Sequence, residues 1–573
     1  MKTDHSPLFS HYTANDRKNQ VKRLIQTEWD LLVIGGGITG AGIAREAALR
    51  GLTVALLDQS DFASGTSSGS SKLAHGGIRY LKQREFNLVR EATTERNWLR
   101  DKALPHLVRP LQFVYPIFRE GEAKGHQLPQ SPDSFRKIRL AVFLYDFLCG
   151  FHNYASREVI KDPDRLKELE PAFDVTGVIG AVLYYDTNLD DARLTIETIW
   201  EGIRTGKVCA LNYMPIFGLI WDDNEKISGA IAVDRAELTG KEEQIQIKAK
   251  AVVNATGVWA DCILGIDEKP ETEIVRPTKG VHLAVRRSDL PVNRAFGIRS
   301  LDDGRFFFVL PRNDWVLIGT TDTDFNGNPS ECYCNAEDAD YLRRTVKVLF
   351  PEAKIEDKDL LGTYASLRPL VFEPGKAESD ISRKHLILER FDSLLTIVGG
   401  KLTTFRKMSE DLLLDHIKPR IKKGYPKFVS RKGVSKIAYW VGMNREDWDN
   451  SEEVKSSNMS QVILNHLYEQ YGKGGLKILQ KTQDDPQMAS RLIDDCSEDI
   501  CPWILGEIDY VVKRECPVHL EDVLSRRMEV AWLVQPVYQG KAAQRATEVM
   551  AKTLRWSEER MQAEIRQYLD YIK

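Results

Sequence analysis

The stretch WDLLVIGGGITGAGIAREAALRGLTVALLD, residues 29–58, decides the fold. An apolar run leads into a glycine-rich turn, a segment of small and apolar residues comes next, and a second apolar run ends at Asp58. This order predicts a strand, a turn, a helix and a second strand parallel to the first, because parallel strands need a crossover between them. Residues 29–58 therefore predict a βαβ unit within an α/β domain.

Three glycines in the turn stand at the spacing Gly-x-Gly-x-x-Gly. Gly35 permits a tight turn, Gly37 lets the backbone approach a pyrophosphate, and Gly40 allows the helix to pack closely on the strand. A phosphate would then lie at the positive N-terminus of the helix, and Asp58 is placed to accept hydrogen bonds from ribose hydroxyls. The residues expected at a dinucleotide here are Gly35, Gly37, Ile38, Thr39, Gly40 and Asp58.

The choice between NAD and FAD depends on the residues after the βαβ unit. A nicotinamide enzyme would continue with ordinary βα units, whereas this chain enters a run of small residues at 63–71. Small residues let backbone amides lie against a long ligand and hydrogen-bond its phosphates. Two distant segments, 255–257 and 399–404, add further glycines, and a helix N-terminus near Leu402 would stabilise negative charge on a reduced flavin. We therefore expect FAD, held also by Thr66, Ser67, Ser70, Ser71, Lys72, His75, Gly76, Gly77, Ala255, Thr256, Gly257, Gly400, Lys401, Leu402 and Thr403.

The rest of the chain is expected to form further domains, since 573 residues exceed what one hydrophobic core usually supports. Residues 210–254 have the pattern of a β-meander, residues 306–318 that of a hairpin, and from about residue 410 the pattern is helical. The predicted domains are an N-terminal polar extension (1–28), a split FAD-binding domain (29–100, 180–260 and 385–410), a substrate-binding domain (101–179 and 261–384) and a C-terminal helical domain (411–573).

Composition excludes several classes of protein. A formal net charge of −3 and an isoelectric point near 6.5 give no sign of the basicity expected of a nucleic-acid binder. The eight cysteines contain no C-x-x-C pair and no histidines at zinc-ligand spacing, which favours reduced thiols over disulfides or a metal site. The sequence shows neither the apolar core of a signal peptide nor a membrane span, so we expect a cytoplasmic protein.

Motifs between Asp30 and about Arg406 resemble those of the FAD-dependent glycerol-3-phosphate dehydrogenases, which are D-amino-acid-oxidase-like flavoproteins. The resemblance implies an α/β fold with a Rossmann-like FAD-binding domain of the glutathione-reductase and D-amino-acid-oxidase type, a β-rich substrate domain and a C-terminal helical domain. The segments that carry it are 34–44, 63–81, 190–194, 254–257, 279–282, 318–322, 366–370 and 399–406.

The resemblance also implies the substrate, sn-glycerol 3-phosphate, and its oxidation to dihydroxyacetone phosphate by hydride transfer to the flavin. A dianionic phosphate needs cationic partners, and arginine suits it because its planar fork binds two oxygens at once. The family pattern implies that the substrate pocket is lined by Arg79, Arg368, Arg383, Lys401 and Tyr80.

The proton acceptor for the substrate hydroxyl stays open among three residues. His75 and His282 are candidates because imidazole titrates near physiological pH, although His75 could equally be a hydrogen-bonding wall beside the flavin. Lys401 is the third candidate, if desolvation and the nearby arginines lower its pKa.

The electron acceptor implied by the resemblance is a quinone at a membrane. Residues 134–151 place Arg136, Lys137 and Arg139 before an apolar helix, which could lie in the headgroup layer of an anionic bilayer or be buried in the substrate domain. The alternatives are a soluble alpha-glycerophosphate oxidase that produces hydrogen peroxide, an amino-acid oxidase of the same fold, and a non-catalytic FAD-binding redox module. The oligomeric state stays open, with a homodimer among the states to test.

Overall fold

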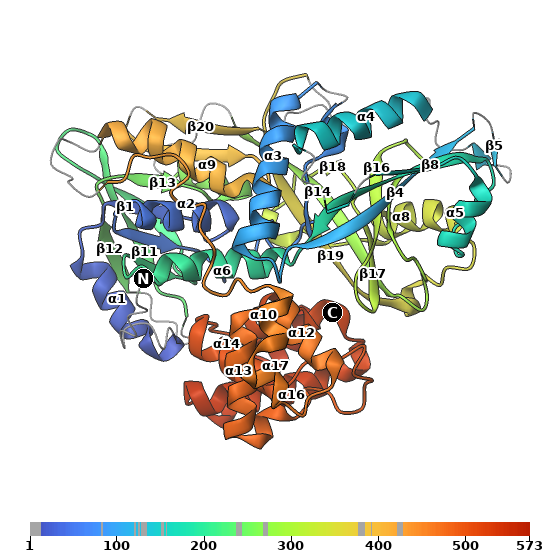
Figure 1. Ribbon diagram of the computed structural model, residues 1–573. Helices are drawn as coiled ribbons and strands as arrows, with labels where there is room; N and C mark the ends of the chain where they lie inside the picture. The colour runs from blue at the N-terminus through green and yellow to red at the C-terminus, as the bar shows by residue number, and fades with distance from the viewer. Residues whose placement is uncertain are drawn as a thin grey trace.

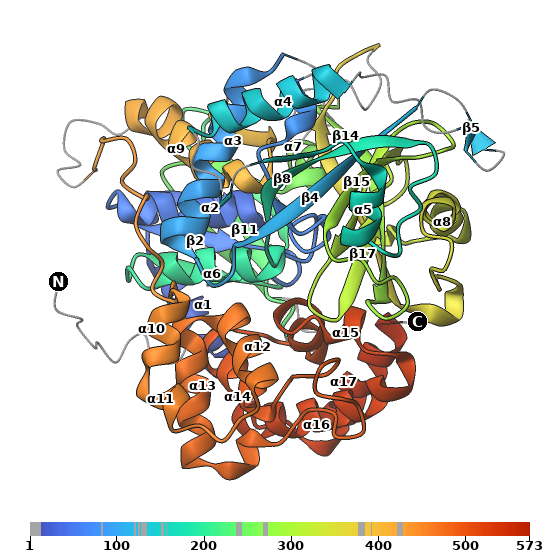
Figure 2. The same cartoon turned by 45° about the vertical axis from the view of Figure 1, so that its right-hand side comes forward.

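The computed structural model describes residues 13–81, 84–119, 122–123, 126–127, 135–150, 154–155, 157–236, 243–266, 273–375, 384–390, 392–420 and 428–572. Two blocks that contain β-sheets lie side by side, and a block of helices from α10 (Arg445–Asn450) to α17 (Glu558–Tyr571) lies beneath both of them (Figures 1 and 2). Among the described residues, no helix is long and apolar enough to cross a bilayer.

The first block is built on a six-stranded sheet in which the predicted βαβ unit lies at the centre. The helix α2 (Ile38–Leu49) connects two parallel strands, and each of the two is buried along its whole length. The strands, in spatial order, are β20 (His385–Glu389), β21 (Leu395–Gly399), β13 (Val252–Asn254), β1 (Leu31–Ile34), β2 (Val54–Leu57) and β9 (Val208–Leu211). All neighbours are parallel except β20 and β21, so the carboxyl ends of five strands lie at one edge.

Both faces of this sheet are covered, as its buried strands require. On one face α2 packs against α6 (Asp191–Ile203) and α9 (Phe405–Asp411). On the other face lies a separate three-stranded antiparallel sheet of β10 (Ile216–Trp221), β11 (Ile227–Val233) and β12 (Gln244–Lys248), with α1 (Arg17–Gln26) beside it. The predicted β-meander is therefore confirmed.

The second block is built on a ten-stranded mixed sheet. Its strands are β3 (Leu73–Ala74), β4 (Arg109–Phe118), β7 (Glu158–Ile160), β8 (Val178–Asn188), β14 (Val275–Arg286), β15 (Ala295–Arg299), β16 (Phe306–Pro311), β17 (Trp315–Gly319), β18 (Thr323–Asp324) and β19 (Leu360–Val371). The hairpin of β16 and β17 is the one predicted from the sequence. The predicted domain boundary at residue 180 falls inside β8, which stays in this sheet up to Asn188.

Helices cover parts of the ten-stranded sheet. The helix α8 (Ala336–Leu349) closes an apolar core formed with β14 to β17, and α4 (Phe135–Leu148) packs on β8 and on α3 (Phe86–Trp98). Short elements complete the two sheet blocks, namely α5 (Pro163–Leu169), α7 (Ala260–Leu264) and the pair β5 (Glu122–Ala123) and β6 (His126–Gln127).

The helical block has its own core, which contains Trp448, Leu467 and Ile508 and is almost free of solvent. Its remaining helices are α11 (Glu452–Lys455), α12 (Gln461–Tyr471), α13 (Lys473–Asp484), α14 (Leu505–Arg514), α15 (Val530–Leu533) and α16 (Pro536–Leu554).

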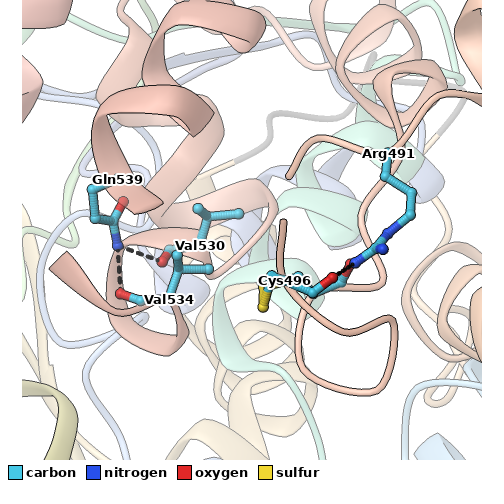
Figure 3. The surroundings of a disulfide bond; sticks show 6 residues. Arg491, Cys496, Val530, Val534 and Gln539 are labelled. Atoms are coloured by element: carbon cyan, nitrogen blue, oxygen red, sulfur yellow. Dashed lines mark hydrogen bonds between the residues drawn. A yellow bond between two sulfur atoms is a disulfide. The ribbon is translucent and has the colours of Figure 1, made fainter. Parts of the chain in front are cut away.

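One cysteine pair in the helical block corrects the sequence analysis. Cys496 and Cys501 form a disulfide, whereas reduced thiols were expected throughout. The loop between them brings their Cα atoms within 6.0 Å, inside the range that a disulfide spans. Arg491 helps to fix this loop by donating to the carbonyl oxygens of both cysteines, and Figure 3 shows it directed at Cys496. The spacing of the two cysteines gave no such signal, because the loop geometry alone brings them together.

Candidate functional site

Two positions of the glycine turn after β1, Gly35 and Gly40, have no room for a side chain. Gly35 has φ of +109°, and a Cβ atom there would lie 2.6 Å from the carbonyl oxygen of Ala255. A Cβ atom at Gly40 would lie 1.8 Å from the carbonyl oxygen of Gly35. Gly40 thus lets the start of α2 pack closely on the turn, as the sequence predicted. Gly35 also lets segment 255–257, which follows β13, approach the turn, which the sequence did not predict.

The start of α2 and the end of β2 supply polar groups beside this turn. The amide of Ile38 donates to Ser67 Oγ at 2.9 Å, which ties the start of the helix to the small-residue run. The carboxylate of Asp58 accepts hydrogen bonds from the amides of Gly36 at 2.6 Å and Ser60 at 2.9 Å. Burial raises the pKa of Asp58 to about 7, so this carboxyl group exchanges its proton near neutral pH. It can therefore accept a hydrogen bond from a ribose hydroxyl or donate one to it.

The small-residue run lies against β19 of the other block. Thr66 donates through Oγ1 to the carbonyl oxygen of Leu367 at 2.6 Å. A Cβ atom at Gly69 would lie 2.3 Å from the Cβ atom of Ser366, so glycine is needed for this close approach. We call residues 61–72 the cofactor loop, because they connect the nucleotide-type turn of one block to the sheet of the other.

His282, on β14, faces the end of the cofactor loop. Its Nε2 atom lies 3.0 Å from Ser71 Oγ, and its ring stacks on Tyr364 with centroids 4.8 Å apart. Burial, with the positive charges of Arg368 and Lys72, lowers the pKa of His282 well below its usual value. Its Nδ1 atom is buried without a hydrogen-bond partner among the described residues. The structure therefore holds a neutral imidazole in this position.

A second cluster lies where the cofactor loop continues beyond β3. The amide of His75 donates to Thr403 Oγ1 at 3.2 Å, and the Nζ atom of Lys401 lies 3.6 Å from the centroid of the Tyr80 ring. Gly77 has φ of +76°, and a Cβ atom there would lie 2.4 Å from the Tyr80 ring. The turn Leu402–Thr404 leads directly into α9, so a helix N-terminus lies beside these side chains, as predicted.

Arg368, on β19, is held by groups at the end of β17. It donates to Asp322 Oδ1 at 3.0 Å, to Thr320 Oγ1 at 2.7 Å and to the carbonyl oxygen of Thr321 at 2.9 Å. The carboxylate of Asp322 is a partner of Arg368 that the sequence did not predict. The Arg368 side chain as a whole keeps about a quarter of its surface exposed.

These residues fit an elongated dinucleotide such as FAD. Gly257 has φ of +61°, and no atom lies within 4 Å of where its Cβ would be, so the backbone there borders open space. The nucleotide end would lie at the turn, the α2 N-terminus and Asp58, and the flavin end at the cluster of Gly77, Lys401 and Leu402.

Comparison with known proteins agrees with this geometry. Residues 30–398 match the family of FAD-dependent oxidoreductases, and residues 436–561 match the C-terminal domain of alpha-glycerophosphate oxidase. The chain belongs to the FAD-dependent oxidoreductase family. FAD is its cofactor, and the predicted fold is confirmed.

Three proteins similar to this oxidoreductase are named for glycerol 3-phosphate or glycerophosphate. The aerobic glycerol-3-phosphate dehydrogenase of Staphylococcus aureus is 38% identical over 411 residues, which cover 71% of this chain and 70% of that protein. The solved glycerol-3-phosphate dehydrogenase from Bacillus halodurans, complexed with FAD, superposes with a TM-score of 0.76 at 26% identity and 98% coverage of both chains. The L-alpha-glycerophosphate oxidase from Mycoplasma pneumoniae, at 17% identity and a TM-score of 0.51, shares the fold over 68% of this chain and 94% of its own.

The structure of this oxidoreductase brings most of the predicted site residues into two connected groups. The glycine turn, Asp58, the cofactor loop and segment 255–257 form one group, and His75, Tyr80, Lys401 and Thr403 form the other. Arg383 and the side chain of Arg79 lie outside the described residues. The individual roles of the site residues stay predictions.

Proposed function

We propose that this oxidoreductase oxidises sn-glycerol 3-phosphate to dihydroxyacetone phosphate, with FAD as the electron acceptor. The observation that carries the proposal is the 38% identity to an aerobic glycerol-3-phosphate dehydrogenase over 71% of the chain. The structural likeness to a second glycerol-3-phosphate dehydrogenase over 98% of the chain supports it independently.

The side chains of the proposed substrate site suit an anionic alcohol. Arg368 and Lys401 are cationic, and the ring of Tyr80, which carries a hydroxyl group, lies against the ammonium group of Lys401. The proposal assigns Arg368, with the predicted Arg79 and Arg383, to the phosphate of the substrate, because a guanidinium fork can bind two of its oxygens. FAD, when bound, supplies the hydride acceptor.

The neutral state of His282 supports it as the group that accepts the hydroxyl proton. A general base must be unprotonated when substrate binds, and burial between Arg368 and Lys72 keeps this imidazole neutral. Its hydrogen-bonding distance from Ser71 Oγ orients the ring toward the cofactor loop. His75 is edge-on to the ring of Phe308, with centroids 6.5 Å apart, which agrees better with its alternative role as a wall.

A direct test of the activity is anaerobic addition of glycerol 3-phosphate to the purified flavoprotein. The proposal expects the visible flavin absorbance to bleach with glycerol 3-phosphate and to stay unchanged with glycerol or with amino acids. Bleaching by amino acids alone would indicate an amino-acid oxidase. An unbleached flavin with every compound would favour a redox module without catalytic activity.

The proposed electron acceptor is a membrane quinone. The alternative, oxygen, would make the protein a peroxide-forming oxidase, and the match of residues 436–561 to an oxidase C-terminal domain keeps that alternative in view. Steady-state oxidation of glycerol 3-phosphate should reduce a soluble quinone much faster than it forms peroxide in air. Peroxide formed in equal amount to the product, with no gain from quinone, would contradict the proposal.

Helix α4 supports contact with a membrane. Leu140, Phe143 and Phe147 are 65%, 43% and 58% exposed and recur at helical spacing, whereas Val142 and Tyr145 on the opposite face are buried. Arg136, Lys137 and Arg139 are exposed at the start of the same helix. An apolar stripe beside cationic residues is typical of a helix that lies in the headgroup layer of an anionic bilayer.

A further inference from the structure

Three charged residues within the stretch Arg526 to Glu529 of the helical block, namely Arg526, Arg527 and Glu529, contact the cofactor loop. All three are buried. They include the end of the helical turn Asp522–Arg527 and precede α15. None of them belongs to the core of the sheet blocks, and the proposed reaction does not use them. Neither the packing of the sheet blocks nor the proposed reaction therefore explains why these residues contact the cofactor loop.

The first end of the cofactor loop is Asp61, which is 1% exposed. Arg526 donates from Nε to Asp61 Oδ2 at 2.6 Å, and Arg527 donates from Nη2 to Asp61 Oδ1 at 2.9 Å. Asn212, beyond β9, donates to the same carboxylate at 2.9 Å. The two positive charges lower the pKa of Asp61 to about 2 against the effect of burial, so it is ionised at neutral pH.

The second end of the cofactor loop is Lys72, which is 3% exposed. Its Nζ atom lies 2.9 Å from Glu529 Oε1 and 2.7 Å from Asp191 Oδ1. Asp191 also accepts the amide of Ser70 at 2.9 Å, so the ion pair is continuous with the backbone of the loop. Glu529 thus reaches the loop from another domain, whereas Asp191 holds it from within the sheet blocks.

The backbone at both partners of this second contact is strained. Lys72 has φ of +53° and Glu529 has φ of +57°, a region that side-chain-bearing residues rarely adopt. Such conformations cost free energy and persist only where the surroundings determine them. Buried charges likewise persist only when they are paired, since the loss of one partner leaves the other uncompensated. Both features mark a contact that the fold maintains at a cost to stability.

We propose that Arg526, Arg527 and Glu529 of the helical domain are positioning residues that clamp both ends of the cofactor loop. The two arginines fix the loop at Asp61 and Glu529 fixes it at Lys72, on either side of the small-residue run 63–71. A loop of glycines and serines has much conformational entropy to lose when it orders around a ligand. Fixing its ends in advance reduces that loss and so strengthens cofactor binding.

This inference rests on the proposed assignment of loop 61–72 to the cofactor. It gives the helical domain a role in the flavin site that a separate module would not have. A purely structural interface is the competing explanation, and the chain offers a contact of that kind for comparison. Glu469 of α12 pairs with Arg109 of β4 and accepts from Asn313 at 2.9 Å, which also joins the helical domain to a sheet block. That contact does not include the cofactor loop.

The test compares Glu529→Gln with the control Glu469→Gln, whose ion pair also joins the two domains but is more exposed. Each variant removes one charge from one cross-domain ion pair, and in Glu529→Gln the ammonium group of Lys72 keeps Asp191 as its partner. In Glu529→Gln the FAD dissociation constant of the apoprotein should rise about tenfold or more, because the loop is less ordered before FAD binds. In the control it should stay within about twofold. An equal effect in both variants, or none in Glu529→Gln, would overturn the clamp.

Hydrogen exchange of the apoprotein provides a measurement that needs no bound flavin. Amides of residues 62–72 should exchange faster in Glu529→Gln than in the control, while amides in the core of the helical domain stay protected in both. Arg527→Lys keeps the charge at Asp61 but loses the fork, so it should show the same pattern to a smaller degree. Unchanged exchange in the loop would mean that the contacts do not order it.

A variant within the loop distinguishes a failure of the clamp from a failure of the assignment of residues 61–72 to the cofactor. Ser67→Leu places a large side chain beside Gly37, where the Cβ position of Gly37 lies 3.1 Å from Ser67 Oγ. If Ser67→Leu weakens FAD binding and Glu529→Gln does not, the clamp is wrong and the cofactor loop stands. If neither variant weakens binding, the assignment of the loop to the cofactor is wrong, and the clamp is wrong with it.

Discussion

Arg368 shows how a single side chain in the proposed substrate site is prepared for an anion. Asp322, Thr320 and Thr321 hold its guanidinium group, so the end of β17 fixes the direction of the fork. Each charge-assisted hydrogen bond to a phosphate contributes about 1.5–3 kcal/mol. The geometry of the fork should therefore matter more than the charge alone.

Replacing Arg368 by lysine tests this point. The Arg368→Lys variant keeps the charge and loses the planar fork, so the KM for glycerol 3-phosphate should rise by about tenfold or more. FAD content should stay unchanged. Arg276→Lys is the control, because Arg276 pairs with Asp324 at an exposed position of the neighbouring strand and should leave KM unchanged. Loss of FAD together with substrate affinity would make Arg368 a structural residue.

His282 allows a prediction about pH. A base with an ordinary histidine pKa would lose half its activity near pH 6.5. Because burial, Arg368 and Lys72 lower the pKa of His282 well below that value, kcat at saturating glycerol 3-phosphate should stay level as the pH falls from 7.5 toward 6. The measurement is the pH profile of quinone reduction in wild-type protein and in His282→Gln. A wild-type profile with a midpoint near pH 6.5 would mean that another group accepts the hydroxyl proton, and His75 would be the first candidate.

The sequence pointed to some of these residues and not to others, for a physical reason. The tight turn at Gly35 and the close packing at Gly40 were predictable because both follow from local chain geometry and a fixed spacing. Asp322 and Glu529 were not, because each acts on a partner reached only through the tertiary fold, and a single carboxylate in a loop carries no pattern.

At the scale of elements, periodicity decided what could be predicted. The βαβ unit and the hairpin of β16 and β17 have strong local signals, and both were found where expected. The boundary between the two blocks near β8 was less predictable, since the chain stays in the ten-stranded sheet up to Asn188 and enters α6 of the other block at Asp191 without a change in composition. For α4 the two interpretations, a buried helix and a helix at a membrane, are each compatible with one face, because one face is buried and the other is exposed.

The exposed stripe of α4 yields a prediction about membrane binding. The double variant Leu140→Gln and Phe147→Gln should bind anionic phospholipid vesicles at least about tenfold more weakly, since burying each side chain contributes about 1.5–3 kcal/mol. Vesicle co-sedimentation at low salt measures this. The control is Val537→Gln, which removes a side chain that is 77% exposed on α16. Equal sedimentation of all variants would place the membrane contact elsewhere or exclude it.

At the scale of the whole molecule, the helical domain is joined to the sheet blocks through buried charges. Besides the clamp, Arg193 of α6 contacts Glu515 of the helical domain, and both side chains are fully buried. Most charged residues of proteins lie on solvated surfaces, so a charge-rich helical sequence gives no sign of such buried pairs. The mode of attachment could not be predicted, because partners several hundred residues apart share no local pattern.

His106 lies in the same interface and makes it sensitive to acid. Its ring is fully buried against Gly472 and Tyr468 of the helical domain, and neither ring nitrogen has a hydrogen-bond partner among the described residues. Burial, with the charges of Arg193 and Arg109, lowers the pKa of His106 to about 3. The folded state therefore binds fewer protons at this site than the unfolded state between about pH 6.5 and pH 3.

The protein should therefore lose stability on acidification, and His106 should account for one part of this loss. Above pH 6.5 the His106 ring is mostly neutral in both states, so it causes little loss of stability. At pH 5 the unfolded state binds a proton there and the folded state does not, which should lower the free energy of unfolding by about 2 kcal/mol. Denaturant unfolding of wild-type protein and of His106→Gln at pH 7.5 and pH 5 measures this, because other titrating groups cancel in the difference. The variant should lose about 2 kcal/mol less than the wild type between the two pH values. Equal losses would mean that the ring is protonated in the folded state, and the interface would then have to supply an anionic partner for it.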